Sequence, residues 1–390
     1  MTLDILCKVV DNFGDIGVAY RLAKALSDRE PSLGIRLVVE GLESFAALAP
    51  EVDPAAEIQA LGNWTVLAWE PSAAAIEAAY RGERPRFVVE CFACGKPDWF
   101  EALVFDDSKE GETVILNLEY LTAEPYARDF HLLPAATRSA RVRKFFFMPG
   151  FEEGTAGLVI DERFRASRER FLDPARRAEA RLEAARAAGL EPEAGRLEAL
   201  WVLVFGYERD YGPLVADLAS HSGGGPGLLA LVAAGKSQAC FLSAWEAAGR
   251  PFPACPLPFL GQEAWDELLL ASDLALVRGE ESLARAALSG RPFAWQAYVQ
   301  EGAHQLVKVG ALLDRMRPCF APAAFEPLER FFLDLNDRLS DSPGVRGDER
   351  LLPVLERLGE LAPGFRRLSE ELVGLGDLAQ RLLTFFCGFL

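Results

Sequence analysis

Two loops of the sequence place acidic side chains beside glycines, the residue types expected where a protein binds and activates a polar ligand. The first loop runs from Val10 to Val18, and its chemistry-bearing residues are Asp11, Asn12, Phe13, Gly14, Asp15 and Gly17. One Asp would suffice to cap the helix that follows, and this stretch holds two Asp and an Asn. The glycines lack the Gly-x-Gly pair of a dinucleotide site, and two acids oppose a pyrophosphate at that turn. We therefore favour a functional role for this loop over simple capping, and the dinucleotide fingerprint is excluded.

The second loop, Leu276–Ser282, also lies between an apolar strand and the start of a helix. Gly279 lets backbone N–H groups approach a ligand, and the helix N-terminus favours an anion. Arg278 offers a charged fork for a diphosphate. A structural alternative exists for the rest, because Glu280 and Glu281 complement a helix dipole and Ser282 is a common cap. We favour a functional site because both loops occupy the same topological place in separate halves.

The elements that must position these loops alternate between strands and helices. The first half predicts strands at 3–10, 35–39, 65–68, 87–89, 114–118 and 144–148, with a helix over 18–26. After a stretch rich in Arg, Glu and Ala (161–195), predicted as an exposed helical bridge with no function, the pattern restarts. The second half predicts strands at 201–205, 228–233, around 255–260 and at 274–277, and helices over 211–220, over 265–271, from 282, 304 and 326, and largely through 351–383. Such alternation predicts two α/β lobes with parallel sheets, whose ligands lie at the carboxyl ends of the strands.

Length and charge limit the classes of function. A chain of 390 residues predicts two or three domains. With 58 acidic and 41 basic side chains the net charge is −17, which excludes broad binding of nucleic acid. No apolar run is long enough to span a membrane, and the N-terminus lacks the features of a signal peptide. The seven scattered cysteines are interpreted as reduced, buried thiols of a cytoplasmic protein.

Other motifs carry less weight. Cys91-x-x-Cys94 has no second pair, and the histidines are distant in sequence, so zinc or redox use is not favoured. The run Phe145–Phe147 is predicted as a core strand rather than a stacking platform. The sequence contains no Gly-x-Ser-x-Gly, Walker loop or His-Glu-x-x-His motif. An NAD-dependent oxidoreductase is disfavoured by the missing dinucleotide fingerprint.

The sequence resembles the bacterial protein-arginine rhamnosyltransferases that mature elongation factor P, the EarP family of glycosyltransferases with the GT-B fold. Seven ordered blocks carry the resemblance: Asp11–Gly17, Glu90–Cys94, Leu118–Glu124, Phe145–Phe151, Phe205–Tyr207, Leu257–Gln262 and Asp273–Tyr298. It departs from the family at Glu281, where Asp is usual, and at Gln296, where His is common.

The resemblance implies two Rossmann-like lobes facing across a cleft. The N-terminal, acceptor-side lobe would comprise residues 1–183 with a C-terminal helix 365–390, and the donor lobe residues 184–364. The implied donor is dTDP-β-L-rhamnose and the implied acceptor is an arginine of elongation factor P, whose activation relieves ribosome stalling at polyproline. No metal, other cofactor, nucleic acid or membrane is expected to take part.

The resemblance also assigns roles to individual residues. In the donor lobe Phe259 would stack on the thymine and Gln262 would hydrogen-bond it, and Arg278 with the turn Gly279–Ser282 would hold the diphosphate. The remaining implied substrate-binding residues are Tyr207, Glu281, Tyr298, Asn12, Phe13, Gly14 and Gly17.

The implied catalytic residues are Asp11, Asp15 and Glu280, and the chemistry explains a need for carboxylates. An arginine guanidinium has a pKa above about 12, so it must be bound, oriented and deprotonated late. Asp15 is our choice of general base, with Asp11 and Glu280 as the alternatives. Single displacement at a β-linked donor would invert the anomeric centre. Two other interpretations remain open: another nucleotide-sugar enzyme (an epimerase or a small-molecule glycosyltransferase), and a non-enzymatic nucleotide-binding adaptor.

Overall fold

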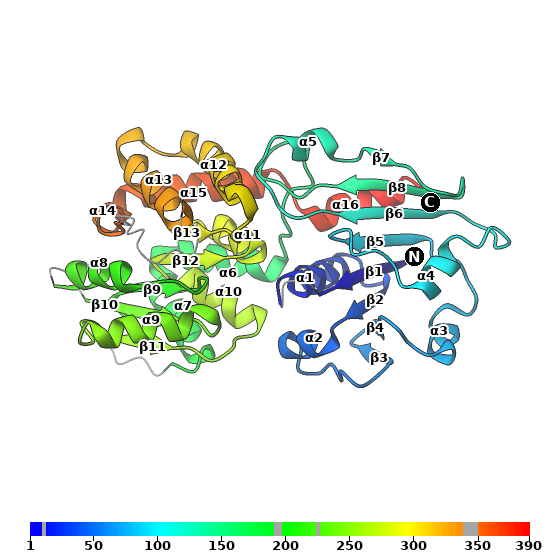
Figure 1. Cartoon of the computed structure of the whole chain (residues 1–390), viewed down its shortest axis with the longest axis horizontal. Coiled ribbons are helices and arrows are strands. Elements are labelled where there is room, and N and C mark those ends of the chain that lie inside the picture. The colour runs from blue at the N-terminus through cyan, green and yellow to red at the C-terminus, as the bar shows by residue number, and fades with distance from the viewer. Residues whose placement is uncertain (10–12, 191–196, 224–226, 338–349) are drawn as a thin grey trace. The chain divides into compact units, whose positions relative to one another are not determined.

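The computed structural model describes residues 1–9, 13–190, 197–223, 227–337 and 350–390, which divide into two compact units (Figure 1). Unit 1 comprises Met1–Glu162 and Leu375–Leu390, and unit 2 comprises Arg163–Gly374. Each unit contains a largely parallel sheet with helices packed on it, which confirms the predicted α/β class of two Rossmann-like lobes. Within the described ranges, no helix is long and apolar enough to cross a membrane.

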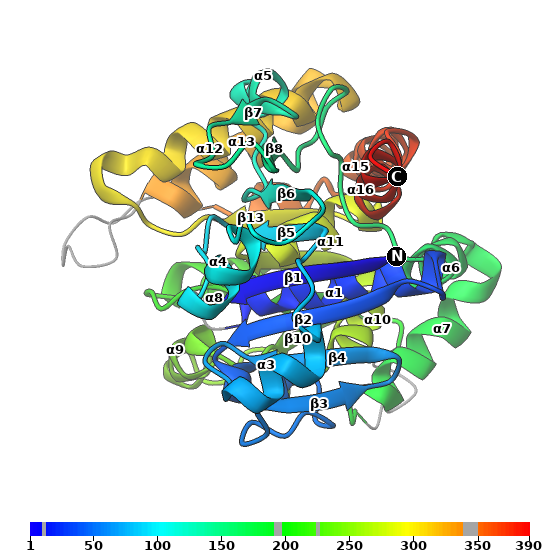
Figure 2. The ribbon, with the colours of Figure 1, turned by 90° about the vertical axis from the view of Figure 1, so that its right-hand side faces the viewer.

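Unit 1 is built on a sheet with the strand order β3-β4-β2-β1-β5-β6-β8-β7, which Figure 2 shows from bottom to top. All neighbours pair in parallel except the antiparallel pairs β3–β4 and β7–β8 at the two edges. Its elements are β1 (Thr2–Lys8), α1 (Gly14–Arg29), β2 (Gly34–Glu40), α2 (Leu42–Leu48), β3 (Ile58–Leu61), β4 (Trp64–Ala68), α3 (Ala73–Tyr80), β5 (Phe87–Cys91), α4 (Asp98–Val104), β6 (Thr113–Leu118), α5 (Tyr126–Phe130), β7 (Pro134–Ala135), β8 (Val142–Phe147) and α16 (Leu378–Cys387).

The central strands of unit 1 are nearly continuous apolar runs because helices cover both of their faces. One face carries Ile5, Val89 and their neighbours and packs against α1, α2 and α16. The other face carries Leu6 and Val88 and packs against α3 and α4. The C-terminal helix α16 thus completes the core that β1 and α1 begin.

Unit 2 is built on an all-parallel sheet with the strand order β11-β10-β9-β12-β13. Helix α11 packs on β12 and β13, α13 packs on β13, and α8 and α9 pack on β10. Its elements are α6 (Glu162–Leu172, which begins at the last residue of unit 1), α7 (Pro174–Ala187), β9 (Leu200–Val204), α8 (Gly212–Ser222), β10 (Leu228–Val232), α9 (Lys236–Ala247), β11 (Ala254–Pro256), α10 (Gln262–Ala271), β12 (Leu274–Arg278), α11 (Glu280–Ser289), β13 (Phe293–Gln296), the 3-10 turns η2 (Glu301–Ala303) and η3 (Arg317–Cys319), α12 (His304–Met316), α13 (Pro322–Asp337), α14 (Leu352–Leu355) and α15 (Leu358–Gly374).

The unit boundaries differ from the predicted ones at 183/184 and 364/365, and the charged stretch 161–195 is not simply a solvated bridge. Helix α6 buries Phe164 and Phe171, helix α7 buries an alanine-rich side, and both pack within unit 2. Arg181 is buried over the ring of Trp201 and donates to Asp273 at 3.0 Å. Arg168 is also buried and donates to the Leu288 carbonyl at 2.9 Å. Long arginine stems cover apolar surface while their charged ends find acceptors, a role that the composition of the stretch conceals.

Candidate active site

In unit 1 the first predicted loop follows β1 and opens α1. Asp11 and Asn12 lie outside the described residues. Phe13 is the N-cap residue of α1 and is exposed, with its carbonyl accepting from the Gly17 N–H at 2.9 Å, and Gly14 is the first helical residue. The N-cap residue Phe13 makes no side-chain cap hydrogen bond, and Asp15 lies inside the helix, so Asp15 is not the N-cap residue of α1.

Asp15 lies in the first turn of α1 and is buried, with 3% of its surface exposed. Its Oδ1 accepts a hydrogen bond of 3.2 Å from the hydroxyl of Tyr120. Tyr120 follows β6 closely in the chain, and its ring stacks on Phe92, which follows β5, at 4.3 Å between centroids and 15° between planes. A buried carboxylate beside exposed aromatic surface is suited to bind a cationic ligand.

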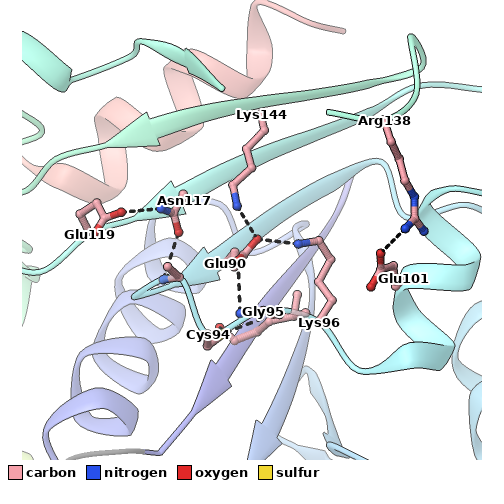
Figure 3. Close-up of polar contacts among 11 residues, drawn as sticks. Glu90, Cys94, Gly95, Lys96, Glu101, Asn117, Glu119, Arg138 and Lys144 are labelled. Carbon is pink, nitrogen blue, oxygen red and sulfur yellow. Dashed lines mark hydrogen bonds and ion pairs between the residues drawn. The ribbon is translucent and has the colours of Figure 1, made fainter. Parts of the chain in front are cut away.

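A polar cluster lies beside this site at the carboxyl ends of β5 and β6 (Figure 3). Glu90 is buried, and its Oε2 accepts from Lys96 at 2.7 Å and from Lys144 at 3.0 Å. Burial alone would raise the pKa of Glu90, but the two lysines outweigh it and hold that pKa below its ordinary value. The neighbouring Glu119, which accepts from the Asn117 amide, has its pKa raised by burial. Glu90 therefore anchors the ammonium groups of Lys96 and Lys144 in this cluster.

In unit 2 the predicted donor residues that the structure describes gather at one edge of the sheet. They follow or end the parallel strands β9, β11, β12 and β13, whose carboxyl ends meet at that edge. Those beyond β9, β11 and β13 are Tyr207, Phe259, Gln262 and Tyr298; those at the end of β12 and in the first turn of α11 are Arg278, Gly279, Glu280, Glu281 and Ser282.

Arg278 ends β12 with its guanidinium over two aromatic rings. The guanidinium carbon lies 4.7 Å from the ring centroids of both Phe205 and Tyr207. Its Nε is buried and unbonded, and Arg278 makes no ion pair with any residue that the structure describes. Two aromatic rings thus contact the guanidinium, and no carboxylate of the described residues pairs with it, which suits an arginine that binds an anion.

The aromatic residues of this edge are placed by neighbouring strands. Tyr207 packs edge-on against Tyr298 at 5.8 Å, and its backbone N–H donates to Gln296 Oε1 at 2.8 Å. Gln296 thus fixes the loop that carries Tyr207. Phe259 and Tyr298 are exposed, and Gln262 begins α10.

The acids that follow Arg278 have partners. Glu280 lies 3.5 Å from the ammonium of Lys308, and Glu281 lies 3.8 Å from the buried Arg285. Gly279, with φ +71°, is the N-cap of α11, so Ser282 lies inside the helix and does not cap it. Both acids do lie in the first turn, as the dipole interpretation expected, and their pairing leaves the charge of Arg278 unopposed.

The described residues include no group of His, Cys, Asp and Glu that could hold a metal ion. None of the seven cysteines, all of which the structure describes, forms a disulfide, but the expectation that they are buried is wrong for several of them. Cys7, Cys91 and Cys319 are buried, Cys94, Cys240 and Cys255 are half-buried, and Cys387, near the chain end, is exposed. Burial raises the pKa of Cys94 to about 12, which does not favour a reactive thiolate.

Sequence reasoning missed several residues that contact the predicted ones: Phe92, Tyr120, Phe205 and Lys308. Phe92, Tyr120 and Phe205 each follow a buried strand within two residues. That position was the signal that could have singled them out, because the carboxyl ends of parallel strands share one edge. Lys308 lies in the middle of α12, and no local pattern marks it.

Fold and site together define the class of protein. Two Rossmann-like units, each with polar side chains at the carboxyl edge of its sheet, have the architecture of GT-B glycosyltransferases. Residues 3–387 match the family described as Elongation-Factor P (EF-P) rhamnosyltransferase EarP. The chain therefore belongs to this family of protein-arginine rhamnosyltransferases, which confirms the resemblance.

Individual relatives agree with this assignment. The chain is 33% identical over 396 residues to a protein-arginine rhamnosyltransferase of Pseudomonas aeruginosa, covering 99% of each chain. It is similar to the solved structure that gives the structural basis for EarP-mediated arginine glycosylation of translation elongation factor EF-P, with TM-score 0.61, 23% identity and coverage of 100% of this chain and 99% of that one. A UDP-GlcNAc 2-epimerase of Neisseria meningitidis bound to UDP-GlcNAc also shares the fold, with TM-score 0.54, 8% identity and full coverage of both chains. The fold alone therefore does not separate a transferase from an epimerase, whereas the family does.

Proposed function

We propose that this protein transfers L-rhamnose from dTDP-β-L-rhamnose to an arginine side chain of translation elongation factor P, with inversion at the anomeric carbon. The observation that carries the proposal is the buried carboxylate of Asp15, fixed by Tyr120, in a chain that belongs to the family of elongation factor P rhamnosyltransferases. A carboxylate in this setting binds a guanidinium, which is the acceptor group that the family name implies.

Unit 1 supplies the acceptor chemistry in this proposal. Asp15 binds the acceptor guanidinium and orients one nitrogen toward the anomeric carbon. As the C–N bond forms, the nitrogen loses its proton to a carboxylate, for which Asp15 is our choice over Asp11 and Glu280. The bond from the anomeric carbon to the diphosphate oxygen breaks, and its electron pair leaves with dTDP. One displacement inverts the centre, so a β-linked donor gives an α-linked product.

Unit 2 supplies the donor site. Phe259, an exposed ring, stacks on the thymine, and Gln262 hydrogen-bonds the base, with Tyr207 and Tyr298 beside the nucleotide. Arg278 and the N-terminus of α11 hold the diphosphate and neutralise the charge of the departing dTDP. With these groups in place the proposed reaction needs no metal ion.

A protein acceptor is supported by exposed apolar surface in unit 1. The ring of Phe130 packs edge-on against Tyr126 at 6.1 Å and against Phe146 at 6.2 Å, and Leu132 and Leu133 follow it in the chain. Tyr126, Phe130, Leu132 and Leu133, here called the α5 patch, are all exposed. Contiguous exposed apolar side chains mark interaction surfaces, and a small acceptor would not need one. We propose that elongation factor P contacts this patch, and that the protein acts in the cytoplasm, where translation factors work.

The test is the intact mass of purified elongation factor P after incubation with this protein and dTDP-β-L-rhamnose. The expected result is a gain of one deoxyhexose, lost when the acceptor arginine is changed to lysine. Asp15→Asn should bind dTDP as the wild type does and transfer no sugar, while Asp28→Asn, at an exposed position of the same helix, should transfer normally. Conversion of the donor to an epimer without acceptor would contradict the proposal, and so would normal transfer by Asp15→Asn.

A further inference from the structure

Two sequence blocks, Glu90–Cys94 and Leu118–Glu124, supply no residue that binds a substrate in the reaction proposed above, yet the structure brings them together beside Asp15. The register of the sheet places Glu90 opposite Asn117 on the neighbouring strands β5 and β6. The loops that follow these strands carry Phe92 and Tyr120, whose rings stack.

The loop after β5 has an unusual backbone. Phe92 and Ala93 are consecutive residues with φ of +57° and +49°, and Gly95 follows with φ +77°. Positive φ is rarely adopted by residues with a side chain, and such strain persists only where the surroundings enforce it. The sequence has Phe and Ala where glycine would relieve this strain, so the side chain of Phe92 has a use at this position.

Two buried polar side chains enforce the turn (Figure 3). The Ala93 N–H donates to Asn117 Oδ1 at 3.1 Å, and the Gly95 N–H donates to Glu90 Oε1 at 3.2 Å. Glu90 is itself fixed by ion pairs with Lys96 and Lys144. Ala93 is thus anchored to β6 and Gly95 to β5. These two anchors fix the direction of the Phe92 ring.

The anchored ring holds an otherwise exposed tyrosine. Tyr120 is 39% exposed, and its ring lies flat on Phe92 while its hydroxyl reaches Asp15. An exposed tyrosine without such a stack would sample several rotamers and lose part of its hydrogen bond.

We propose that Tyr120 is a positioning residue for Asp15, and that Phe92 on its anchored turn holds Tyr120 in place. The inference rests on the proposed function, since it concerns the carboxylate that accepts the proton. By donating to Oδ1, the Tyr120 hydroxyl fixes the rotation of the Asp15 carboxylate. That fixes the direction from which its second oxygen meets the acceptor nitrogen, and such alignment is gained in the transition state rather than in ground-state binding.

The test is steady-state rhamnosyl transfer to elongation factor P by Tyr120→Phe, Phe92→Leu, Phe92→Tyr and the double variant Tyr120→Phe/Phe92→Leu. Tyr120→Phe should lower kcat about 10- to 100-fold, the loss expected for a hydrogen bond to a charged group, with the KM for acceptor and the affinity for dTDP unchanged. Phe92→Leu should lower kcat by a smaller factor than Tyr120→Phe does. Phe92→Tyr keeps an aromatic ring against Tyr120, so its kcat should stay near that of the wild type. The double variant should be no slower than Tyr120→Phe, because both changes break one chain of contacts.

Tyr20→Phe is the matched control, since Tyr20 lies in the core of unit 1 and its loss of a hydroxyl should leave kcat unchanged. The inference is overturned if Tyr120→Phe keeps the wild-type kcat, if only KM moves, or if the two losses multiply. A wild-type protein that transfers no sugar would overturn the proposed function and this inference with it, whereas equal transfer by wild type and Tyr120→Phe would overturn the inference alone.

Discussion

The substitution Arg278→Lys keeps the positive charge and removes the guanidinium, so it measures what the shape of this group contributes to dTDP binding. The guanidinium carbon of Arg278 lies over the rings of Phe205 and Tyr207, at 4.7 Å from each centroid. Contact with both rings restricts the orientation of the guanidinium, and its planar fork can present two N–H groups to two diphosphate oxygens together. Lysine keeps the charge but replaces the planar guanidinium with a tetrahedral ammonium, which cannot present two parallel N–H groups to the diphosphate.

The expected loss follows from that geometry. The change removes one of two hydrogen bonds to a charged group, and each such bond contributes about 1.5–3 kcal/mol. The dissociation constant for dTDP should therefore rise about 10- to 150-fold at 25 °C. Binding of thymidine, which has no phosphate, should change little, because Phe259 and Gln262 are the proposed contacts of the base.

Isothermal titration calorimetry with dTDP and with thymidine measures both expectations. Arg250→Lys is the control, since Arg250 is an exposed arginine that pairs with Glu246 at 2.8 Å and should bind both ligands as the wild type does. Unchanged dTDP affinity in Arg278→Lys would refute the assignment of the diphosphate to Arg278. An equal loss of affinity for thymidine would also refute the assignment, because it would show that Arg278 supports the fold or the base site rather than the diphosphate.

Three further expectations test other parts of the molecule. Phe259→Ala should weaken dTDP binding by about 1–3 kcal/mol through loss of base stacking, measured in the same titrations. Phe130→Ser should raise the KM for elongation factor P while leaving dTDP affinity unchanged, and an unchanged KM in transfer assays would exclude the α5 patch as a contact. Burial, with a smaller effect of Arg381, lowers the pKa of His131 from 6.5 to about 4. As the pH falls from 6.5 to about 4, the unfolded chain is therefore protonated at His131 before the folded chain is, and the free energy of unfolding declines. His131→Asn keeps an acceptor for the Met148 N–H without titrating, so its melting temperature should fall less than that of the wild type over this range.

The sheets were largely predictable from the sequence because their strands are buried on both faces. Continuous apolar runs such as Leu274–Val277 correspond to strands of the structure, and the helices predicted near 18–26 and 265–271 are part of α1 and α10. The short edge strand β3 was missed, since its residues alternate between exposed and half-buried. Helices α6 and α7 were recognised as helices but placed on the wrong side of the unit boundary, because their composition does not show which side packs.

The candidate site was predictable as loops but not as contacts. Strand–turn–helix patterns located Asp15 and Arg278, because a parallel sheet places such turns at one edge. The hydrogen bond from Tyr120 to Asp15 joins residues 105 positions apart, and the pairing of Glu280 with Lys308 depends on how α12 packs. Local sequence patterns do not predict such contacts, because they depend on the order of the strands and on how the helices pack.

The N-terminus of the helix at the carboxyl edge of the sheet is proposed to bind a cation in unit 1 and an anion in unit 2. The ion pairs of the acidic residues explain this difference. A helix N-terminus at the carboxyl edge of a sheet ordinarily attracts an anion. In unit 1 the first turn of α1 already contains the carboxylate of Asp15, so the site favours a cation. In unit 2 the acids of the corresponding turn are paired with Lys308 and Arg285, which leaves Arg278 to meet an anion. A guanidinium acceptor and a diphosphate donor are therefore each matched to one unit, and exchange of Arg278 for an acid should abolish donor binding while acceptor binding persists.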